Sequence, residues 1–218
     1  VAHNGALHLE IVVRGKQAHA AMPETGADAL EAATAILSAI YGERRRLSGT
    51  VSATPGIGSP KITVGLISGG INTNVVPDRI VMRVDRRLTP EEDGASVEAG
   101  LNALVEAAVA EMPGIEIECR RIILAEPLRT LPGTERLVET IQKHATEVLG
   151  ETPPATAVPL YTDARHYTAA GVPTVLYGAG PRSILEANAH AADEHVQIRD
   201  LKAATQVIEA TLRDLLRS

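Results

Sequence analysis

The chain has 218 residues, a net charge of −6 and no Phe or Trp, so aliphatic side chains have to build its core. This length accommodates one large domain or two small ones. No basic cluster recurs along one face, which argues against partners such as nucleic acid or an anionic membrane. The single cysteine, Cys119, excludes an internal disulfide and a cysteine-rich zinc site. No apolar stretch approaches the ~20 residues of a membrane span, and no signal peptide is visible. We expect a cytoplasmic protein.

The first half of the chain alternates between strand and helix patterns. Two stretches with helical spacing open at Asp28 and at Thr89, and each has a glutamate three residues later, as in a capping box. Four runs alternate apolar and polar side chains at the period of a half-buried strand: residues 7–13, 62–66, 80–84 and 115–123. The order βαββαβ predicts an α+β, ferredoxin-like arrangement, with two helices on one face of a four-stranded sheet. The other face and the edge strands are then open for association.

The character of the chain changes after the proline- and glycine-rich segment Pro127–Gly133, which indicates a linker between residues 1–127 and residues 128–218. The expected elements beyond it are a helix capped by Thr134 and ended by Gly150, a helix over 163–170, a strand over 174–177 and a helix over 201–215. These elements are too few to close an α/β sheet. We therefore expect half of a domain whose other half lies upstream of Val1 and which the first segment interrupts.

Three candidate site residues lie in the first segment. His19 is in the loop GKQAHAAMP, where an exposed histidine without a function is the alternative. Asn74 is in NVVPD before a strand and fits a simple turn equally. Arg87 is at the far end of that strand, where an arginine either holds a carboxylate in a bidentate contact or is a solvated charge.

The second segment holds further polar candidates. Asp163 and Arg165 in TDAR fit an N-cap and a surface residue. His190 lies in NAHAADEHV beside two carboxylates, a combination that suits zinc, although the spacing matches no self-contained zinc motif. By itself this loop fits a polar surface loop as well.

Together and in order, these motifs resemble the dinuclear-zinc deacetylase, desuccinylase and carboxypeptidase family, over essentially the whole chain. The segments that carry the resemblance are Gly15–Pro23, Asn74–Asp78, Val84–Pro90, Thr162–Arg165, VPTVLYGAG and NAHAADEHV. The TDAR segment followed by GVPTVLYGAG is most similar to the acetylornithine deacetylase and succinyl-diaminopimelate desuccinylase branch. Position 195 is His where the family commonly has Tyr.

The resemblance implies a lid and dimerisation domain followed by the C-terminal part of an α/β zinc-peptidase catalytic domain. In this family, a water that bridges two zinc ions attacks the amide of an N-acyl amino acid or a peptide. The resemblance implies that His190 is a zinc ligand and that His19 steadies the oxyanion, usually in the partner's site of a homodimer. It implies substrate contacts for Asn74, Arg87 and the backbone of Gly178. We expect Asn74 and Arg87 to lie at one end of the lid sheet and to point the same way.

The family's other metal ligands and its general base normally precede the lid, so we expect this chain alone to be inactive. Two alternatives fit the residues. One is a non-catalytic dimerisation or amino-acid-sensing module, which would not need the 160–196 segment. The other is a natural truncated relative that serves only as a dimer partner.

Overall fold

A computed structural model of the chain describes residues 1–180, 186–188 and 191–217. By its contacts, the chain divides into two units. The lid unit comprises His3–Leu128 and Ala157–Arg165, and the returning unit comprises Val1–Ala2, Arg129–Thr156 and His166–Ser218. The stretch Ala157–Arg165 thus groups with the lid unit, whereas the sequence placed it in the catalytic segment. The functional division at residue 127 stays a prediction.

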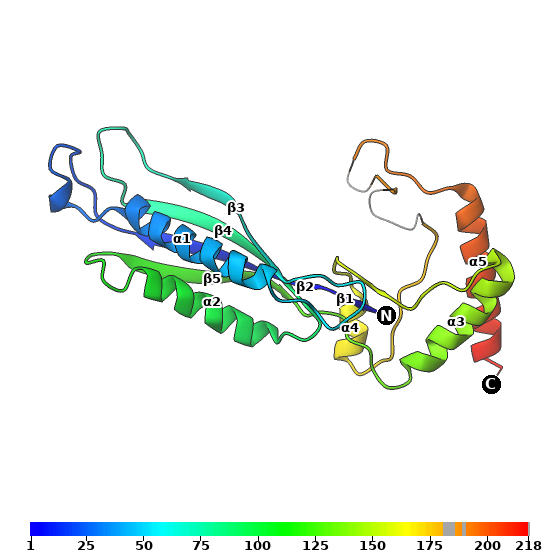
Figure 1. The fold of residues 1–218 in the computed structure, drawn as a ribbon. Helices are drawn as coiled ribbons and strands as arrows, with labels where there is room; N and C mark the ends of the chain where they lie inside the picture. The colour runs from blue at the N-terminus through cyan, green and yellow to red at the C-terminus, as the bar shows by residue number, and fades with distance from the viewer. Residues whose placement is uncertain (181–185, 189–190, 218) are drawn as a thin grey trace. The chain divides into compact units, whose positions relative to one another are not determined.

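The lid unit contains one four-stranded antiparallel sheet with the strand order β3-β4-β2-β5 (Figure 1). Its strands are β2 (Gly5–Arg14), β3 (Lys61–Gly69), β4 (Arg79–Leu88) and β5 (Glu116–Ala125). The two strands that run centrally, β2 and β4, pair over their whole length from Gly5↔Leu88 to Arg14↔Arg79. The predicted βαββαβ order and the mixed α and β class are confirmed.

The helices α1 (Ala29–Ser48) and α2 (Gly94–Ala108) cover one face of this sheet (Figure 1). Asp28 caps α1, because its carboxylate accepts hydrogen bonds from the backbone N–H groups of Leu30 at 2.7 Å and Glu31 at 3.1 Å. The core between helices and sheet is aliphatic, as the composition required. Its most deeply buried large side chains include Leu7, Leu9, Ile11, Ile36, Ile40, Ile62 and Met82.

The predicted start of α2 at Thr89 is wrong. The backbone N–H of Thr89 donates to the Glu92 carboxylate at 2.9 Å, so this half of the capping box closes a turn and not a helix. Asp93 then accepts from the N–H of Ser96 at 2.8 Å and serves as the N-cap. The second cap signal, four residues later, determines where the helix begins.

The face of the sheet opposite the helices is lined by charged side chains paired across strands. Glu10 on the central strand β2 lies 2.8 Å from the Arg83 guanidinium of β4 and is also bonded to Arg120 of β5. Glu10 is only 8% exposed, because the side chains of the two arginines lie over it. Arg14 pairs with Glu118 at 3.1 Å further along. This face therefore carries a ladder of ion pairs.

The returning unit is built mainly from the helices α3 (Thr134–Leu149) and α5 (Ile198–Leu215), which pack on each other. Ala145 of α3 and Ala204 and Val207 of α5 are buried there. Asp214 of α5 joins the two helices by accepting from His144 at 3.0 Å and Lys143 at 2.8 Å. The shorter elements of the described chain, which are not confined to this unit, are β1 (Ala2–His3), η1 (Pro23–Thr25), β6 (Ala157–Val158) and α4 (Ala164–Ala169).

Two local predictions for the second half are wrong. Thr134 does not cap α3, because its hydroxyl accepts from the backbone N–H of Leu131 at 3.3 Å and Gly133, with φ 93°, takes the cap position. The segment 174–177 is not a strand, since strand structure requires a hydrogen-bonded neighbour and this segment finds none among the described residues. The left-handed stop at Gly150 (φ 76°) is confirmed. None of the helices in the described ranges is long and apolar enough to cross a membrane.

Candidate functional site

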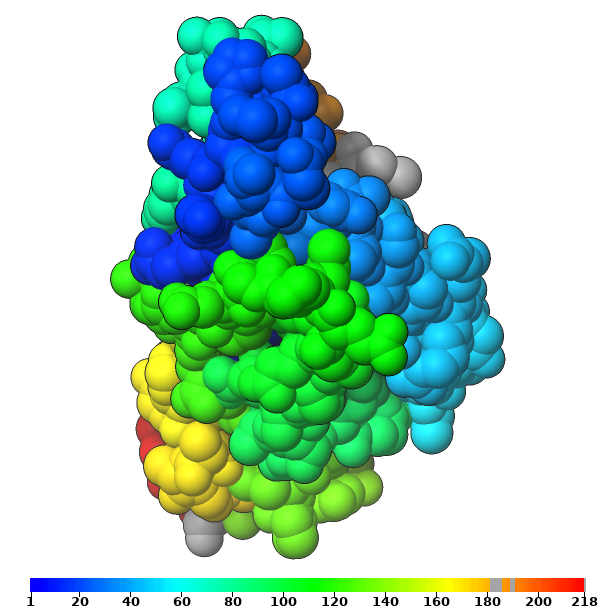
Figure 2. Space-filling view, turned by 90° about the vertical axis from the view of Figure 1, so that its left-hand side faces the viewer, coloured from blue at the N-terminus to red at the C-terminus, as the bar shows by residue number. Residues whose placement is uncertain are grey.

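The structure brings His19 and Asn74 together at one end of the lid sheet, which we call the tip. The two loops pair as a short antiparallel ladder: the N–H of Ala20 donates to the carbonyl of Asn74 at 3.0 Å, and the N–H of Val76 donates to that of Ala18 at 2.9 Å. Figure 2 shows the two loops, dark blue and teal, packed against each other at the top of the view. Both His19 and Asn74 are exposed. Their positions therefore depend on each other.

The imidazole of His19 is held in one tautomer when it is neutral. Its Nδ1 accepts a hydrogen bond from the backbone N–H of Ala21 at 3.0 Å. The proton of the neutral ring is therefore on Nε2. An exposed Nε2–H on a backbone-anchored loop is a hydrogen-bond donor available to a molecule outside the lid.

Arg87 lies at the opposite end of the sheet, which we call the base. It pairs with Ala6, and Ala6 pairs with Ala125, so the base is where the chain enters and leaves the sheet. Arg79, at the tip end of β4, is eight residues away, which corresponds to about 27 Å of strand. The expectation that Asn74 and Arg87 share one end of the sheet is therefore wrong. A strand that begins after Asn74 and ends after Arg87 separates the two residues by its own length.

At the base, Arg87 is already engaged by an acid of its own strand. Its Nε lies 2.9 Å from Asp85 Oδ1 and its Nη2 lies 3.0 Å from Asp85 Oδ2. Asp85 also lies 3.4 Å from His8 Nε2. On the other side, the guanidinium carbon of Arg87 stands 5.6 Å from the centre of the Tyr161 ring, within cation–π range. The guanidinium is thus held in place and partly neutralised.

His3 is a residue of the base that no sequence pattern indicated. It is fully buried, its Nδ1 lies 2.8 Å from the carbonyl of Asn4, and its Nε2 accepts from the N–H of Thr162 at 3.2 Å. Burial, the largest effect, lowers the pKa of His3, so the neutral ring is favoured. The ring thereby anchors the segment that carries Tyr161. This role is visible only from the residues that contact the ring, such as Thr162, which is 159 residues away in the sequence.

Gly178 belongs to the returning unit and lines a cavity of about 630 Å³. The loop residues Tyr177 and Glu186 and the α5 residues Arg199 and Asp200 line the same cavity. Burial raises the pKa of Tyr177, so its hydroxyl stays protonated at neutral pH. A Cβ added at Gly178 meets no described atom within 4 Å, so none of the described residues of this unit requires a glycine there.

His190 lies outside the described residues, and its proposed role as a metal ligand stays a prediction. Close to it in sequence, His195 Nδ1 lies 2.8 Å from the carbonyl of Asp193. Among residues 1–180, 186–188 and 191–217, no three His, Cys, Asp or Glu side chains come together as a metal ion would require. The described residues therefore do not form a metal centre by themselves.

Comparison with curated proteins shows similarity to two amidohydrolases over nearly the whole chain. It is 27% identical to an acetylornithine deacetylase of Myxococcus xanthus, covering 95% of this chain and 52% of that protein. It is also 27% identical to a putative succinyl-diaminopimelate desuccinylase of Mycobacterium tuberculosis, covering 95% of this chain and 53% of that protein. The chain thus spans about half the length of the curated relatives it matches.

Solved structures share the fold. The aminopeptidase PepT of Bacillus cereus superposes with a TM-score of 0.77 at 21% identity, over 99% of this chain and 53% of that chain. A tripeptidase of Staphylococcus aureus gives a TM-score of 0.73 at 20% identity, over 100% of this chain and 53% of that chain. The family model for the peptidase dimerisation domain matches residues 1–113, which is more than half of the chain. The chain therefore belongs to the peptidase dimerisation domain family.

Proposed function

We propose that this chain is the lid and the C-terminal catalytic portion of a zinc-dependent amidohydrolase that cleaves an N-acyl amino acid or a small peptide and acts as a homodimer. The observation that carries the proposal is the tip, where backbone contacts hold the His19 Nε2–H as an exposed donor. Hydrolysis of an amide develops negative charge on the carbonyl oxygen. A fixed donor aimed at that oxygen lowers the barrier, and its removal costs ~10²–10³ in kcat.

The tip also supports a role for Asn74. Its side-chain amide offers a neutral donor of the type that binds a carboxylate. The hydrogen bond from Ala20 to the Asn74 carbonyl couples its position to that of the His19 loop. One substrate can therefore contact both residues, with its reacting carbonyl at His19 and its carboxylate at Asn74.

Arg87 requires a different arrangement, because the length of β4 separates it from the tip. No small substrate spans about 27 Å, so one lid cannot apply its tip and its base to the same molecule. A two-fold dimer with antiparallel lids resolves this, since the tip of each lid then faces the base end of its partner. We propose that His19 and Asn74 serve the partner's site, while Arg87 serves the site of its own subunit.

The edge strand β3 is the surface that best supports such a dimer. Leu66 and Ile67 on this edge are 65% and 50% exposed, and Lys61 is the only charged residue of the strand. The other edge strand, β5, carries Glu116, Glu118, Arg120 and Arg121, and charged edges discourage pairing. Exposed Leu30 and Tyr41 of α1, the helix that contacts β3, extend the apolar surface.

Zinc would lower the pKa of a bound water and polarise the amide carbonyl. We propose His190 as the one ligand that this chain supplies and the backbone of Gly178 as a substrate contact beside it. The other metal ligands and the general base would come from a part of the enzyme that corresponds to the unmatched half of the relatives.

The exposed apolar side chains of α5 support the proposal that another part of the enzyme packs against this chain. Ala204 and Val207 face α3, yet Leu201, Ile208 and Leu212 are exposed. At helical spacing the exposed three lie next to the buried ones, so the apolar face of α5 is wider than the part that α3 covers. We propose that the remainder of the catalytic domain covers the exposed part of this face and that the chain alone has no hydrolytic activity.

Subunit mixing tests the proposal in the complete enzyme. His19→Ala and Arg87→Ala subunits should each be nearly inactive alone. When they are mixed and allowed to exchange, a mixed dimer has one site that combines the Arg87 of one subunit with the partner's His19. Activity should recover to about a quarter of wild type, because half of the dimers are mixed and each has one competent site.

Other arrangements predict a different outcome. If both residues act within one subunit, or both act across the dimer, no mixed dimer contains a complete site and mixing restores nothing. Demonstrated subunit exchange without recovery therefore contradicts the assignment. The alternative of a non-catalytic dimerisation or sensing module predicts that even the wild-type complete protein hydrolyses no N-acyl amino acid.

A further inference from the structure

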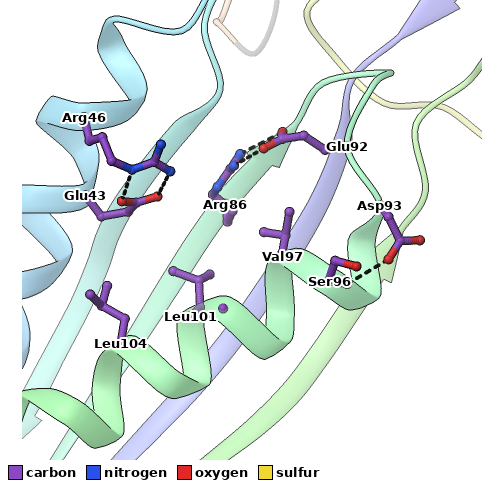
Figure 3. A pocket seen from close by; sticks show the side chains of 10 residues that line it. Glu43, Arg46, Arg86, Glu92, Asp93, Ser96, Val97, Leu101 and Leu104 are labelled. Atoms are coloured by element: carbon purple, nitrogen blue, oxygen red, sulfur yellow. Dashed lines mark hydrogen bonds and ion pairs between the residues drawn. The ribbon is translucent and has the colours of Figure 1, made fainter.

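A cavity of about 490 Å³ lies in the lid unit between α1 and α2, on the helix-covered face of the sheet (Figure 3). Its volume is in the range of small-molecule sites. Neither the tip residues His19 and Asn74 nor Arg87 line it. It is therefore a candidate for a second ligand site, separate from the proposed catalytic residues.

Two ion pairs from different elements form one wall of this cavity. Arg46 and Glu43 of α1 make a bidentate pair at 2.7 and 2.6 Å. Arg86 of β4 pairs with Glu92, and its Nη1 also donates to the carbonyl of Arg87. Figure 3 shows the two pairs facing each other.

The charges of the two pairs influence each other. The hydrogen bond from Arg46 lowers the pKa of Glu43, burial opposes this shift, and the charge of Arg86 adds to the lowering. Conversely, the hydrogen bond and the charge of Glu43 raise the pKa of Arg46, and the charge of Glu92 contributes. The four groups thus carry no net charge, and Asp93, which also lines the cavity, adds a carboxylate that accepts from the N–H of Ser96 at 2.8 Å.

Of these four residues, Arg86 is the one whose burial is least explained by packing alone. Arg86 is only 3% exposed, although its side chain carries a full positive charge. A buried ion pair is seldom more stabilising than an apolar pair of similar volume. Glu92 and the carbonyl of Arg87 hold this guanidinium at the wall of the cavity, where its positive charge can meet a ligand carboxylate.

The opposite wall is apolar. Val97, Leu101 and Leu104 lie at helical spacing on α2 and point into the cavity beneath the charged pairs (Figure 3). Gly100 lines the same cavity from an exposed position on α2, and a Cβ added there meets no atom within 4 Å. The cavity therefore has a charged side, an apolar side and an open edge at a glycine.

We infer that this cavity binds a small aliphatic zwitterion, the chemical class of a free α-amino acid. The ligand carboxylate would lie between Arg46 and Arg86, its ammonium group would face Glu43 and Glu92, and its side chain would contact Leu101 and its neighbours. A zwitterion leaves the net charge of the four groups unchanged. An anion such as phosphate would face two carboxylates, and a cation would face two guanidinium groups.

This inference goes beyond the proposed catalytic function and does not depend on it, because binding can be measured on the present chain without metal or activity. Methyl-labelled protein is titrated with L-leucine and followed by NMR. We expect saturable shifts of the Val97, Leu101 and Leu104 methyl groups with a Kd on the order of 1 mM. Leucine amide, N-acetyl-leucine and inorganic phosphate should each bind at least tenfold more weakly, since each lacks one of the two opposite charges.

Two variants with matched controls locate the site. Gly100→Leu places a side chain at the open edge and should abolish binding, with a melting temperature at or above wild type because leucine favours the helix more than glycine does. Ala99→Leu, an exposed neighbour outside the cavity, should bind normally. Arg46→Gln should weaken binding tenfold or more, whereas Arg44→Gln, which is exposed on the same helix, should not.

Three results would overturn the inference. The first is the absence of methyl shifts at twenty times the expected Kd. The second is equal or tighter binding of N-acetyl-leucine, leucine amide or phosphate, which would show that the site does not select a zwitterion. The third is leucine binding that persists in folded Gly100→Leu, which would place the ligand elsewhere.

Discussion

The two units of this chain bury their apolar residues in different ways. In the lid unit, two helices and a sheet enclose a continuous aliphatic core, and side chains such as Leu9 and Ile36 are almost fully covered. In the returning unit, the buried apolar set at the contact of α3 and α5 is small, and Leu212 of α5 is 50% exposed. Asp28 and Asp93 cap the lid helices, whereas α3 and α5 start at Gly133 and Gln197 without a side-chain cap.

This difference shows that the lid unit has the features of a self-sufficient fold, while the returning unit has those of a part that needs a further surface. Closed packing and caps stabilise an element locally. An amphipathic helix whose apolar stripe is only partly covered gains most of its stability when another layer covers the rest. Substitutions should therefore act differently in the two units.

Leucine truncation should give the largest contrast. Leu9→Ala leaves a cavity in the closed core of the lid unit and should lower its free energy of unfolding by about 2–5 kcal/mol. Leu212→Ala, at an exposed position of the returning unit, should change that unit's stability by less than about 0.5 kcal/mol. Urea denaturation followed by amide NMR signals of each unit measures both. Equal losses would contradict the distinction.

Removal of helix caps should give a smaller contrast. Asp28→Ala removes the acceptor for two backbone N–H groups of α1 and should destabilise the lid unit by about 1 kcal/mol. Gln197→Ala stands at the same position of α5, where the side chain makes no cap hydrogen bond, and should have almost no effect. If both changes are neutral in the same denaturation assay, the caps do not contribute to the difference between the units.

Acid should reveal the smallest effect, at Glu91 in the turn after β4, which binds the loop that follows α1. Burial would raise the pKa of Glu91, but hydrogen bonds from the backbone, Ser52 and Thr54 lower it from 4.5 to about 2. A depressed carboxyl pKa contributes stability above the unfolded value, and that stability is lost as the pH falls from 4.5 towards 2. Because the side chain is exposed, we expect a contribution below about 1 kcal/mol.

Glu91→Gln should remove this part of the pH dependence in the lid unit. Glu139→Gln, at an exposed position of α3, is the control and should leave the lid signals unchanged at every pH. The comparison requires free energies of unfolding at several pH values between 2 and 5. Identical pH profiles for the wild type and Glu91→Gln would show that the loop contacts do not stabilise the ionised carboxylate.

The sequence predicted the lid better than the returning unit, for physical reasons. Apolar and polar side chains alternate along most of β2 and along β4, so the strands and their order followed from the pattern, although burial alternates only in β4 and β2 is buried on both faces. The run 174–177 has a strand composition, but a strand also needs a neighbour to pair with. The start of α2 was misplaced because two cap signals, at Thr89 and Asp93, compete within four residues.

The candidate site was only partly predictable. His19 stood out by its loop, but its tautomer and its pairing with the Asn74 loop depend on backbone contacts between distant segments. The opposite placement of Asn74 and Arg87 could have been found by counting the ten strand residues of β4. His3 could not, because a lone histidine near the start of a strand gives no sign of the Thr162 segment that it holds.

The ion-pair ladder on the open face of the lid has a consequence for how the sequence tolerates change. Glu10 is bonded to both Arg83 and Arg120, so the loss of either arginine leaves the acid with a partner. Loss of Glu10 instead leaves two like charges facing each other across β2, which is destabilising. The three residues Glu10, Arg83 and Arg120 should therefore tolerate substitution unequally. Single substitutions should accumulate at either arginine. A neutral residue at position 10 should be tolerated only together with compensating changes at both arginines.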